Sequence, residues 1–319
     1  MKRTILLCLL MSSFLMGSNY TKGLNAYESS DYQRAQKYFM KASNKGNALA
    51  QYYLGMMFDN GQGIKQDYKK AVYFYKKAAK NGLAMAQSSL GFMYELGYGI
   101  EKNDVKAVKM YERAVNQNYA PAQYNLGYMY ASGTGVIQDF GEAIVLYEKA
   151  AKQGVSMAQY TLARMYDEGK DVEVDYTKAL YYYTQAGEQG HILAQTYLGS
   201  MYLEGKCVNK DYQKARVWYE KAAAQNGAVA QYELASMYLY GKGVEKNAIE
   251  ALTLYQRSAD QGNVSAQNNL ASMYTSGEGV KKDYQKALEI YEKLAIEGES
   301  SAKENLKLFC EKYPLVCKE

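Results

Sequence analysis

The stretch Ala122-Gln123-Tyr124-Asn125-Leu126-Gly127-Tyr128-Met129-Tyr130-Ala131-Ser132-Gly133-Thr134-Gly135 decides the fold, because close copies of it recur along most of the sequence. Its Ala-Gln pair returns every 36 residues, with no insertion or deletion, at Gln51, Gln87, Gln159, Gln195, Gln231 and Gln267. A fixed period of roughly 20 to 50 residues is typical of a solenoid, in which one small unit of secondary structure is stacked repeatedly. The sequence therefore predicts an array of repeats.

The composition agrees with a helical array. The 319 residues include 35 tyrosines but only two prolines, Pro121 and Pro314. A solenoid grows by stacking, so it is not bound by the length at which a single core divides into domains. The net charge of +5 is spread over Lys, Glu and Asp in every repeat, and so mild a balance does not predict nucleic-acid binding.

Residues 1–18 are predicted to be a secretory signal peptide. Lys2 and Arg3 precede a short apolar run that ends at Met16, and small residues follow it. This order is typical of a signal peptide, and the run is too short to span a membrane. An uncleaved buried helix is the alternative. Cleavage would give a mature chain without a membrane span in a secreted or periplasmic location.

The rest of the chain is predicted to contain three parts. Residues 19–46 form an N-terminal capping helix pair, residues 47–298 form seven 36-residue repeats, and residues 299–319 form a C-terminal capping helix and tail. In each repeat, apolar residues at intervals of three and four mark one buried face of a first helix. A glycine-containing turn then leads to a second helix.

Glycine and aspartate recur in fixed places within the repeat. Turns such as Gly61-Gln62-Gly63 predict left-handed backbone. A further glycine lies inside the first helix, as at Gly55, where it costs about 1 kcal/mol relative to Ala. Only Ala replaces it, so we expect the two helices of a repeat to meet there backbone to backbone. N-caps of the second helix are predicted at Asp67, Asp139, Asp175, Asp211 and Asp283.

The complete pattern resembles the Sel-one-like repeat, a relative of the tetratricopeptide repeat. It reads Ala-x-x-x-Leu-Gly-x-x-Tyr-x-x-Gly-x-Gly-Val-x-x-Asp-Tyr-x-Lys-Ala-x-x-x-Tyr-x-Lys-Ala-Ala-x-x-Gly, as in residues 194–223 with local changes. The resemblance covers about residues 19 to 310. It implies an all-α fold, a right-handed α-solenoid of antiparallel helix pairs, with a concave groove that binds proteins or peptides.

Secreted bacterial members of this family include the Helicobacter cysteine-rich proteins, in which a cysteine pair joins the two helices of each repeat. This chain differs from them, because the slots for one such cysteine hold Ala79, Val115, Ala151 and Ala223. The resemblance therefore implies, only as an alternative, binding of β-lactams or peptidoglycan fragments, or a weak β-lactamase activity. Cell-wall fragments are accordingly a second kind of partner.

Cysteines are few. On one continuous helix, Cys310 and Cys317 would lie about 10.5 Å apart, too far for a disulfide. Pro314 can break that helix and let the tail fold back, so in an oxidising compartment a bond between them would close the C-terminal cap. The sequence leaves open whether they are bonded. Cys207 lies in a turn without a nearby basic cluster and is predicted to be a free thiol.

No catalytic residue, metal site or cofactor is predicted. His191 is the only histidine, and it occupies a turn slot so variable that we expect it to face solvent. One histidine without paired cysteines cannot form a structural zinc site. The Ser-x-x-Lys spacing at Ser300 to Lys303 matches β-lactamases, but no Ser-Asp-Asn or Lys-Thr-Gly accompanies it, so we interpret it as coincidence.

Two variable slots of the first helix are the candidate binding positions. Their aromatic members gather in the first half of the array, and Tyr and Arg are favoured anchors at interfaces. We therefore predict a groove lined by Tyr52, Phe92, Tyr124, Tyr128, Tyr160 and Arg164. The alternative is a solvated face without a ligand. The identity of the partner and the oligomeric state stay open.

Overall fold

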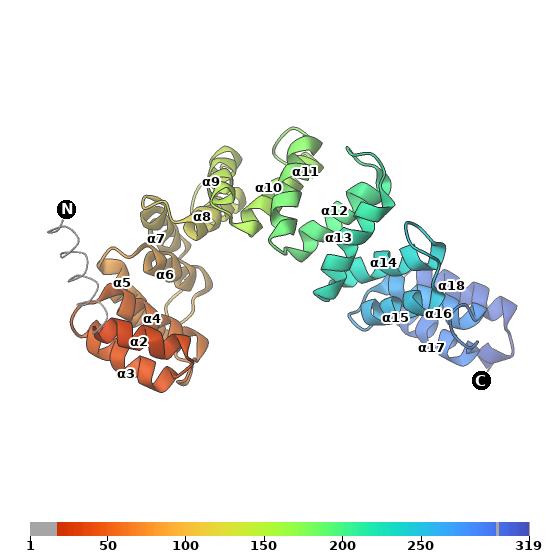
Figure 1. Ribbon diagram of the computed structural model, residues 1–319, viewed down its shortest axis with the longest axis horizontal. Helices are drawn as coiled ribbons and strands as arrows, with labels where there is room; N and C mark the ends of the chain where they lie inside the picture. The colour runs from red at the N-terminus through yellow and green to blue at the C-terminus, as the bar shows by residue number, and fades with distance from the viewer. Residues whose placement is uncertain (1–17, 298–299, 319) are drawn as a thin grey trace, which may run out of the picture. The chain divides into compact units, whose positions relative to one another are not determined.

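The computed structural model describes residues 18–297 and 300–318, and every regular element within them is a helix (Figure 1). The predicted all-α repeat fold is confirmed. The predicted signal peptide lies outside the described residues except for Ser18, which caps the first helix. The helices are α2 (Asn19–Glu28), α3 (Tyr32–Ser43), α4 (Ala48–Asn60), α5 (Tyr68–Lys80), α6 (Ala84–Leu96), α7 (Asp104–Val115), α8 (Ala120–Ser132), α9 (Phe140–Lys152), α10 (Ser156–Glu168), α11 (Tyr176–Glu188), α12 (Ile192–Glu204), α13 (Tyr212–Ala224), α14 (Ala228–Tyr240), α15 (Ala248–Ala259), α16 (Val264–Ser276), α17 (Tyr284–Ile296), α18 (Ser300–Lys312) and the 3-10 helix η1 (Val316–Lys318).

The helices alternate between two kinds. We call the even-numbered ones A helices and the odd-numbered ones B helices. An A helix packs against the B helix that follows it, as α4 does with α5, and that B helix packs against the next A helix. Contacts divide the chain into two compact units, of which unit 1 ends at Ala158 and unit 2 begins at Gln159, within α10. No described helix is long and apolar enough to cross a membrane.

The core of each unit is built from the same slots in every repeat. Ala50 and Ala71 are fully buried where helices approach closely, and Met57 and Tyr75 fill the space beside them. Unit 2 repeats this arrangement with equivalent residues. The methionine that recurs once in each repeat also packs in this core. Six of its seven members are buried and Met165 is partly buried, the six being Met57, Met93, Met129, Met201, Met237 and Met273.

The glycine inside the A helix has a different cause from the one expected. A Cβ atom added to Gly55 would lie 2.5 Å from the ring of Tyr75, and one added to Gly199 would lie 2.5 Å from the ring of Tyr219. The slot therefore holds glycine because a tyrosine ring from the B helix lies over it. Close backbone contact was the wrong explanation, and the ring overlap explains why nothing larger than Ala occurs there.

The turns contain the caps and the left-handed glycine that the sequence predicts. The predicted caps are confirmed: the carboxylate of Asp67 accepts a hydrogen bond from the Lys70 amide at 3.0 Å, and the other four aspartates do the same in their helices. Gly61 adopts the expected left-handed conformation at the end of α4. In unit 2, Asp171 and Cys207 adopt positive φ angles of 64° and 62° where other repeats have glycine.

A chain of buried amide side chains links successive helices, and we call it the glutamine ladder. In unit 1, the Gln87 side chain donates to the Ala79 carbonyl of the preceding B helix at 3.4 Å. Its own oxygen accepts a hydrogen bond from Gln117, at the end of the following B helix, at 2.7 Å. In unit 2, Gln231 bonds in the same way at both ends. The Ala-Gln marker of the repeat thus ties each A helix to two B helices.

The C-terminal end closes on itself. A disulfide joins Cys310 to Cys317, whose Cα atoms are 5.6 Å apart. This geometry is possible because α18 ends before Pro314 and the chain turns back into η1. Tyr313 packs against Tyr284 of α17, with ring centroids 4.5 Å apart, so the closed tail covers the last helix pair.

Candidate functional site

The surface that the A helices leave uncovered is the candidate site, and we call it the A face. On α8 it is formed by the side chains that are not buried against neighbouring helices, Tyr124, Asn125, Tyr128, Ala131 and Ser132. Residues three and four apart lie on one side of a helix, so these positions form a single strip. The equivalent positions of the other A helices form the A face of each unit.

Four of the six predicted binding residues lie on the A face of unit 1. Phe92 on α6 and Tyr128 on α8 occupy the same slot, with 44% and 53% of their side chains exposed. Tyr52 and Tyr124 are half-buried, because their rings pack against Tyr75 and Tyr147 of the following B helices, with centroids 5.8 Å and 5.6 Å apart. The A face of unit 1 is therefore aromatic, with two of its rings free for contact.

The other two predicted residues lie in unit 2 and are already engaged. Tyr160 is buried, and its ring stacks on His191 with centroids 4.4 Å apart. The Nε atom of Arg164 donates to Glu168 at 2.8 Å, one turn along α10. The binding roles of Tyr160 and Arg164 stay predictions, but a partner would meet a covered ring and a neutralised guanidinium.

The prediction that His191 faces solvent is wrong. His191 caps α12, where its Nδ1 atom accepts a hydrogen bond from the Ala194 amide at 3.3 Å. Burial lowers the pKa of His191, because a charged imidazolium loses hydration there. The same slot holds Asn47 and Asn263 in other repeats, which cap their helices in the same way. The slot caps its helix where it holds His or Asn, whereas Leu83, Tyr119 and Gly227 form no such hydrogen bond.

Two carboxylates on the A face of unit 1 were missed from the sequence. Asp59 accepts a hydrogen bond from the Tyr75 hydroxyl at 3.1 Å, and Glu95 accepts one from the Tyr111 hydroxyl at 2.7 Å. Both acids are half-buried and occupy the same slot in successive repeats. The recurrence of an acid eight residues after the repeated glutamine was the available signal.

The buried tyrosines hold these carboxylates in a defined direction. Burial raises the pKa of Tyr75, and the neighbouring Asp59 raises it further; burial and Glu95 do the same to Tyr111. A phenol with a raised pKa stays protonated and remains a donor. Burial also raises the pKa of Asp59, while the hydrogen bond from Tyr75 opposes that rise.

The same slots behave differently in unit 2. Asp167 forms an ion pair with Lys206 at 2.6 Å, and the hydroxyl of Tyr183, buried beside it, has no hydrogen-bond partner among the described residues. Within the same residues the buried Tyr255 hydroxyl also lacks a partner, since the slot that holds Asp59 in unit 1 is occupied by Leu239. On α14, burial and the nearby Glu204 raise the pKa of Glu233.

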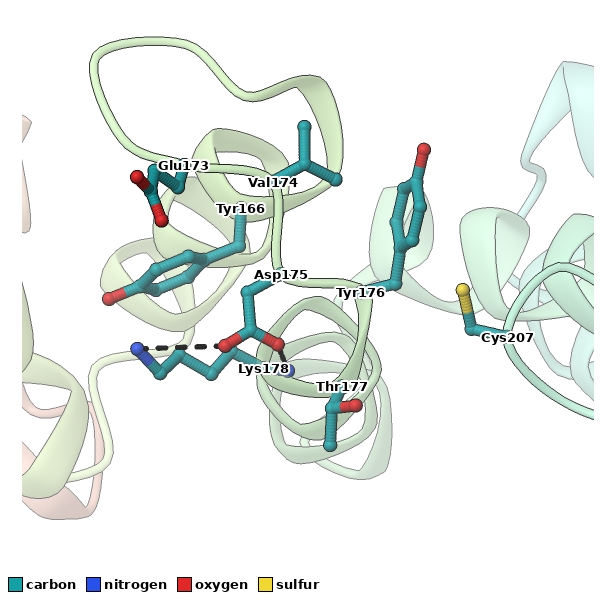
Figure 2. Close-up of a pocket in the computed structure, with 8 residues that line it drawn as sticks. All are labelled: Tyr166, Glu173, Val174, Asp175, Tyr176, Thr177, Lys178 and Cys207. Carbon is teal, nitrogen blue, oxygen red and sulfur yellow. Dashed lines mark hydrogen bonds and ion pairs between the residues drawn. The ribbon is translucent and has the colours of Figure 1, made fainter.

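A separate cavity of about 470 Å³ lies beside the turn that precedes α11 (Figure 2). Figure 2 shows Tyr166 and Glu173 on one side of it and Tyr176 and Cys207 on the other. The Asp175 carboxylate, which caps α11, lies 3.6 Å from the Lys178 ammonium, and that ammonium lies over the Tyr166 ring. Two of the charges beside this cavity, on Asp175 and Lys178, are thus paired with each other.

No group of three or more His, Cys, Asp or Glu side chains that could hold a metal ion occurs in the described part of the chain. Cys207 is exposed, as expected of a free thiol. The Ser300 side chain, which begins the Ser-x-x-Lys spacing, lies outside the described part of the structure.

Comparison with known proteins identifies the repeat. The sequence model of the Sel1 repeat matches eight consecutive segments, at residues 11–47, 48–83, 84–119, 120–155, 156–191, 192–227, 228–263 and 264–299. The helix pair predicted as an N-terminal cap therefore falls within a matched repeat. No curated protein matches the chain.

Two solved structures are similar to this chain, and the first of them supports the same family. A Sel1 repeat protein from Oxalobacter formigenes is similar to this chain, with 36% sequence identity and a TM-score of 0.71 over 75% of this chain and 98% of that one. A protective antigen of uropathogenic Escherichia coli is 27% identical, with a TM-score of 0.42 over 92% of this chain and 79% of the antigen.

Proposed function

Because this chain belongs to the Sel1 repeat family, we propose that it is a scaffold that binds a protein or peptide partner along the A face of unit 1. Sel1 repeats generally mediate interactions between proteins. The observation that carries the proposal is the pair of exposed rings, Phe92 and Tyr128, which occupy one slot in successive A helices.

The rings of Phe92 and Tyr128 leave apolar surface in contact with water. A large apolar side chain that is about half exposed stabilises a complex when a partner covers it, at roughly 25 cal/mol per Å² of apolar surface buried. Aromatic anchors surrounded by weaker contacts are typical of binding hot spots. The scaffold beneath them is closely packed, since Tyr111 and Tyr147 of the following B helices are buried. A partner therefore pays little to order this surface.

We also propose a secreted or periplasmic location. The charged and then apolar start of the sequence supports export. The bond between Cys310 and Cys317 supports it too, since disulfides persist in oxidising compartments and are rare in the cytosol.

The test is selection of peptides on the folded protein. A random peptide library displayed on phage is selected against the immobilised chain, and the affinities of the selected peptides are then measured for variants. The double variant F92A/Y128A should weaken binding at least about tenfold, the loss expected when hot-spot rings are removed. Circular dichroism should show unchanged helix content, because both rings are exposed.

A matched control comes from the B helices. Tyr73 on α5 is 52% exposed, nearly as much as Tyr128, but belongs to the other side of the repeat. Y73A removes a similar ring and should leave affinity unchanged. If Y73A and F92A/Y128A weaken the selected peptides equally, the A face of unit 1 is not the binding surface.

A further inference from the structure

We propose that the partner on the A face of unit 1 is a basic, extended peptide segment, whose Arg or Lys side chains bind Asp59 and Glu95. This inference rests on the proposed function and adds the chemical class of the partner. It follows from three observations: the separation of charge between A and B helices, the fixed direction of the two carboxylates, and the aromatic rings beside them.

Charge is separated between the two kinds of helix from α4 to α9 of unit 1, although the first A helix, α2, carries both Lys22 and Glu28. The A helices α4, α6 and α8 contain no Lys or Arg, and Asp59 and Glu95 are their only charged residues. The B helices α5, α7 and α9 contain ten Lys and Arg against four Asp and Glu. The overall charge of +5 hides this division. A basic segment is attracted to the A face and repelled by the B helices, whereas an acidic segment experiences the reverse.

The two carboxylates are fixed but not neutralised. One oxygen of Asp59 accepts from the Tyr75 hydroxyl and one oxygen of Glu95 accepts from the Tyr111 hydroxyl. Neither acid forms an ion pair with any residue in 18–297 or 300–318. Each has a second oxygen that accepts no side-chain hydrogen bond from the described residues, and both side chains are partly exposed. Because the phenols already order them, binding costs less side-chain entropy.

The rings favour a cation as the neighbour. Phe92 lies three residues before Glu95 on α6, so the ring and the carboxylate share one side of the helix. A cation placed there is attracted both by the carboxylate and by the face of an aromatic ring. The planar guanidinium of Arg satisfies both at once, forming two hydrogen bonds while it stacks. We therefore expect Arg to bind more tightly than Lys.

The experiment measures binding of three labelled peptides to the full chain by fluorescence anisotropy. The peptides are repeats of Gly-Ser-Arg, Gly-Ser-Gln and Gly-Ser-Glu, which are extended and flexible. The Arg peptide should bind at least about tenfold more tightly than the other two, and its affinity should fall as salt increases. The double variant D59N/E95Q should remove that preference. Asn and Gln still accept the tyrosine hydrogen bonds, so the fold is kept.

A control variant separates local charge from total charge. E112Q/E142Q removes two exposed acids from B helices α7 and α9 and changes the net charge by the same amount. It should alter the affinity for the Arg peptide less than about twofold. The variant Y75F/Y111F keeps every charge and both rings but releases the carboxylates, and should weaken the Arg peptide by about threefold if their direction matters.

Failure of this inference can be told apart from failure of the proposed function. Equal or tighter binding of the Glu peptide, equal sensitivity to E112Q/E142Q, or no binding of the Arg peptide would each overturn the basic partner. Library peptides that depend on Phe92 and Tyr128 would still support the A face as the binding surface. If the Arg peptide binds but F92A/Y128A leaves its affinity unchanged, a different surface binds it and the basic partner is overturned, whereas the library peptides alone decide the proposed function.

Discussion

Unit 1 and unit 2 are built from the same repeat, but the side chains on their A faces form different interactions. In unit 1, the buried tyrosines Tyr75 and Tyr111 donate to carboxylates on the A face. In unit 2, Asp167 is paired with Lys206, and the hydroxyls of Tyr183 and Tyr255 have no hydrogen-bond partner in the part of the chain that the structure describes. The tyrosine slot is constant, so the difference arises in the acid slot: Lys206 binds Asp167 beside Tyr183, and Leu239 replaces the acid opposite Tyr255.

The repeat contains two kinds of position, those that pack in the core and those that face outward. Residues that pack, such as the buried methionines and tyrosines, recur in both units because each repeat buries the same face. Residues that face outward change without disturbing that packing, and they give each unit its own surface chemistry. Function in a solenoid is therefore carried by the variable slots.

The largest expected effect concerns the turn slot that holds glycine in unit 1 and Cys207 in unit 2. Gly99 has a φ of +66°, and a Cβ atom on it would overlap the backbone of Tyr68. G99A should lower the free energy of unfolding by about 3 kcal/mol, from left-handed strain and overlap together. C207G should instead raise it, by up to about 1 kcal/mol, since Cys207 already adopts a φ of +62°. Urea denaturation followed by circular dichroism measures both. Equal losses in the two variants would show that the two turns are equivalent.

The next effect depends on pH. Burial raises the pKa of Tyr255 to about 12, above the value near 10 of an unfolded tyrosine. A group whose pKa is raised on folding stabilises the protein below its unfolded pKa, and that stability is lost as the pH rises toward the folded pKa. The wild type should therefore lose stability between about pH 10 and 12. Y255F should lose about 2 kcal/mol less over that interval, measured by urea denaturation at both pH values. An identical loss would place the Tyr255 hydroxyl in contact with water.

A smaller effect on stability is expected from substituting the equivalent tyrosines of the two units, Tyr75 and Tyr183. Y75F removes a hydroxyl that donates to Asp59, so it should lower the free energy of unfolding by about 1 kcal/mol. Y183F removes a buried hydroxyl that has no partner, so it should raise that free energy by a similar amount. Opposite signs for the same substitution would confirm the difference between the units. The same sign for both would refute it.

The smallest expected effect concerns the reason why the Tyr183 hydroxyl has no hydrogen-bond partner among the described residues. The Asp167 carboxylate lies near Tyr183 but is bound to Lys206. K206Q should free that carboxylate to accept from the Tyr183 hydroxyl, so the net change in stability should stay within about 0.5 kcal/mol. In the K206Q background, Y183F should then become destabilising, as Y75F is in unit 1. A double-mutant cycle on the four proteins measures this reversal.

Much of the fold could be predicted because it depends on local rules. The 36-residue period gave the array, and Asp67 was recognisable as a cap from its place before a helix. The reason why position 55 holds glycine could not be predicted, because it depends on where the ring of Tyr75 lies. His191 was misjudged because variability was read as exposure, although several residue types can occupy a capping slot.

The candidate site could be predicted only in part. Phe92 and Tyr128 lie on the A face because their slots follow helical spacing. The burial of Tyr160 depends on His191, which is 31 residues away in the sequence and therefore outside any local pattern. The roles of Asp59 and Glu95 depend on distances to Tyr75 and Tyr111 in the neighbouring helix. Contacts between helices, rather than helices themselves, were the missing information.

The glutamine ladder has a consequence for how such a chain can change in length. Within each unit, junctions use the same amide donors and acceptors, as at Gln87 and Gln231. A duplication or deletion of one 36-residue segment therefore leaves matching groups on both sides of the new joint. Whole repeats, each with its own pair of outward residues, can be added or removed by recombination without a compensating mutation in the core.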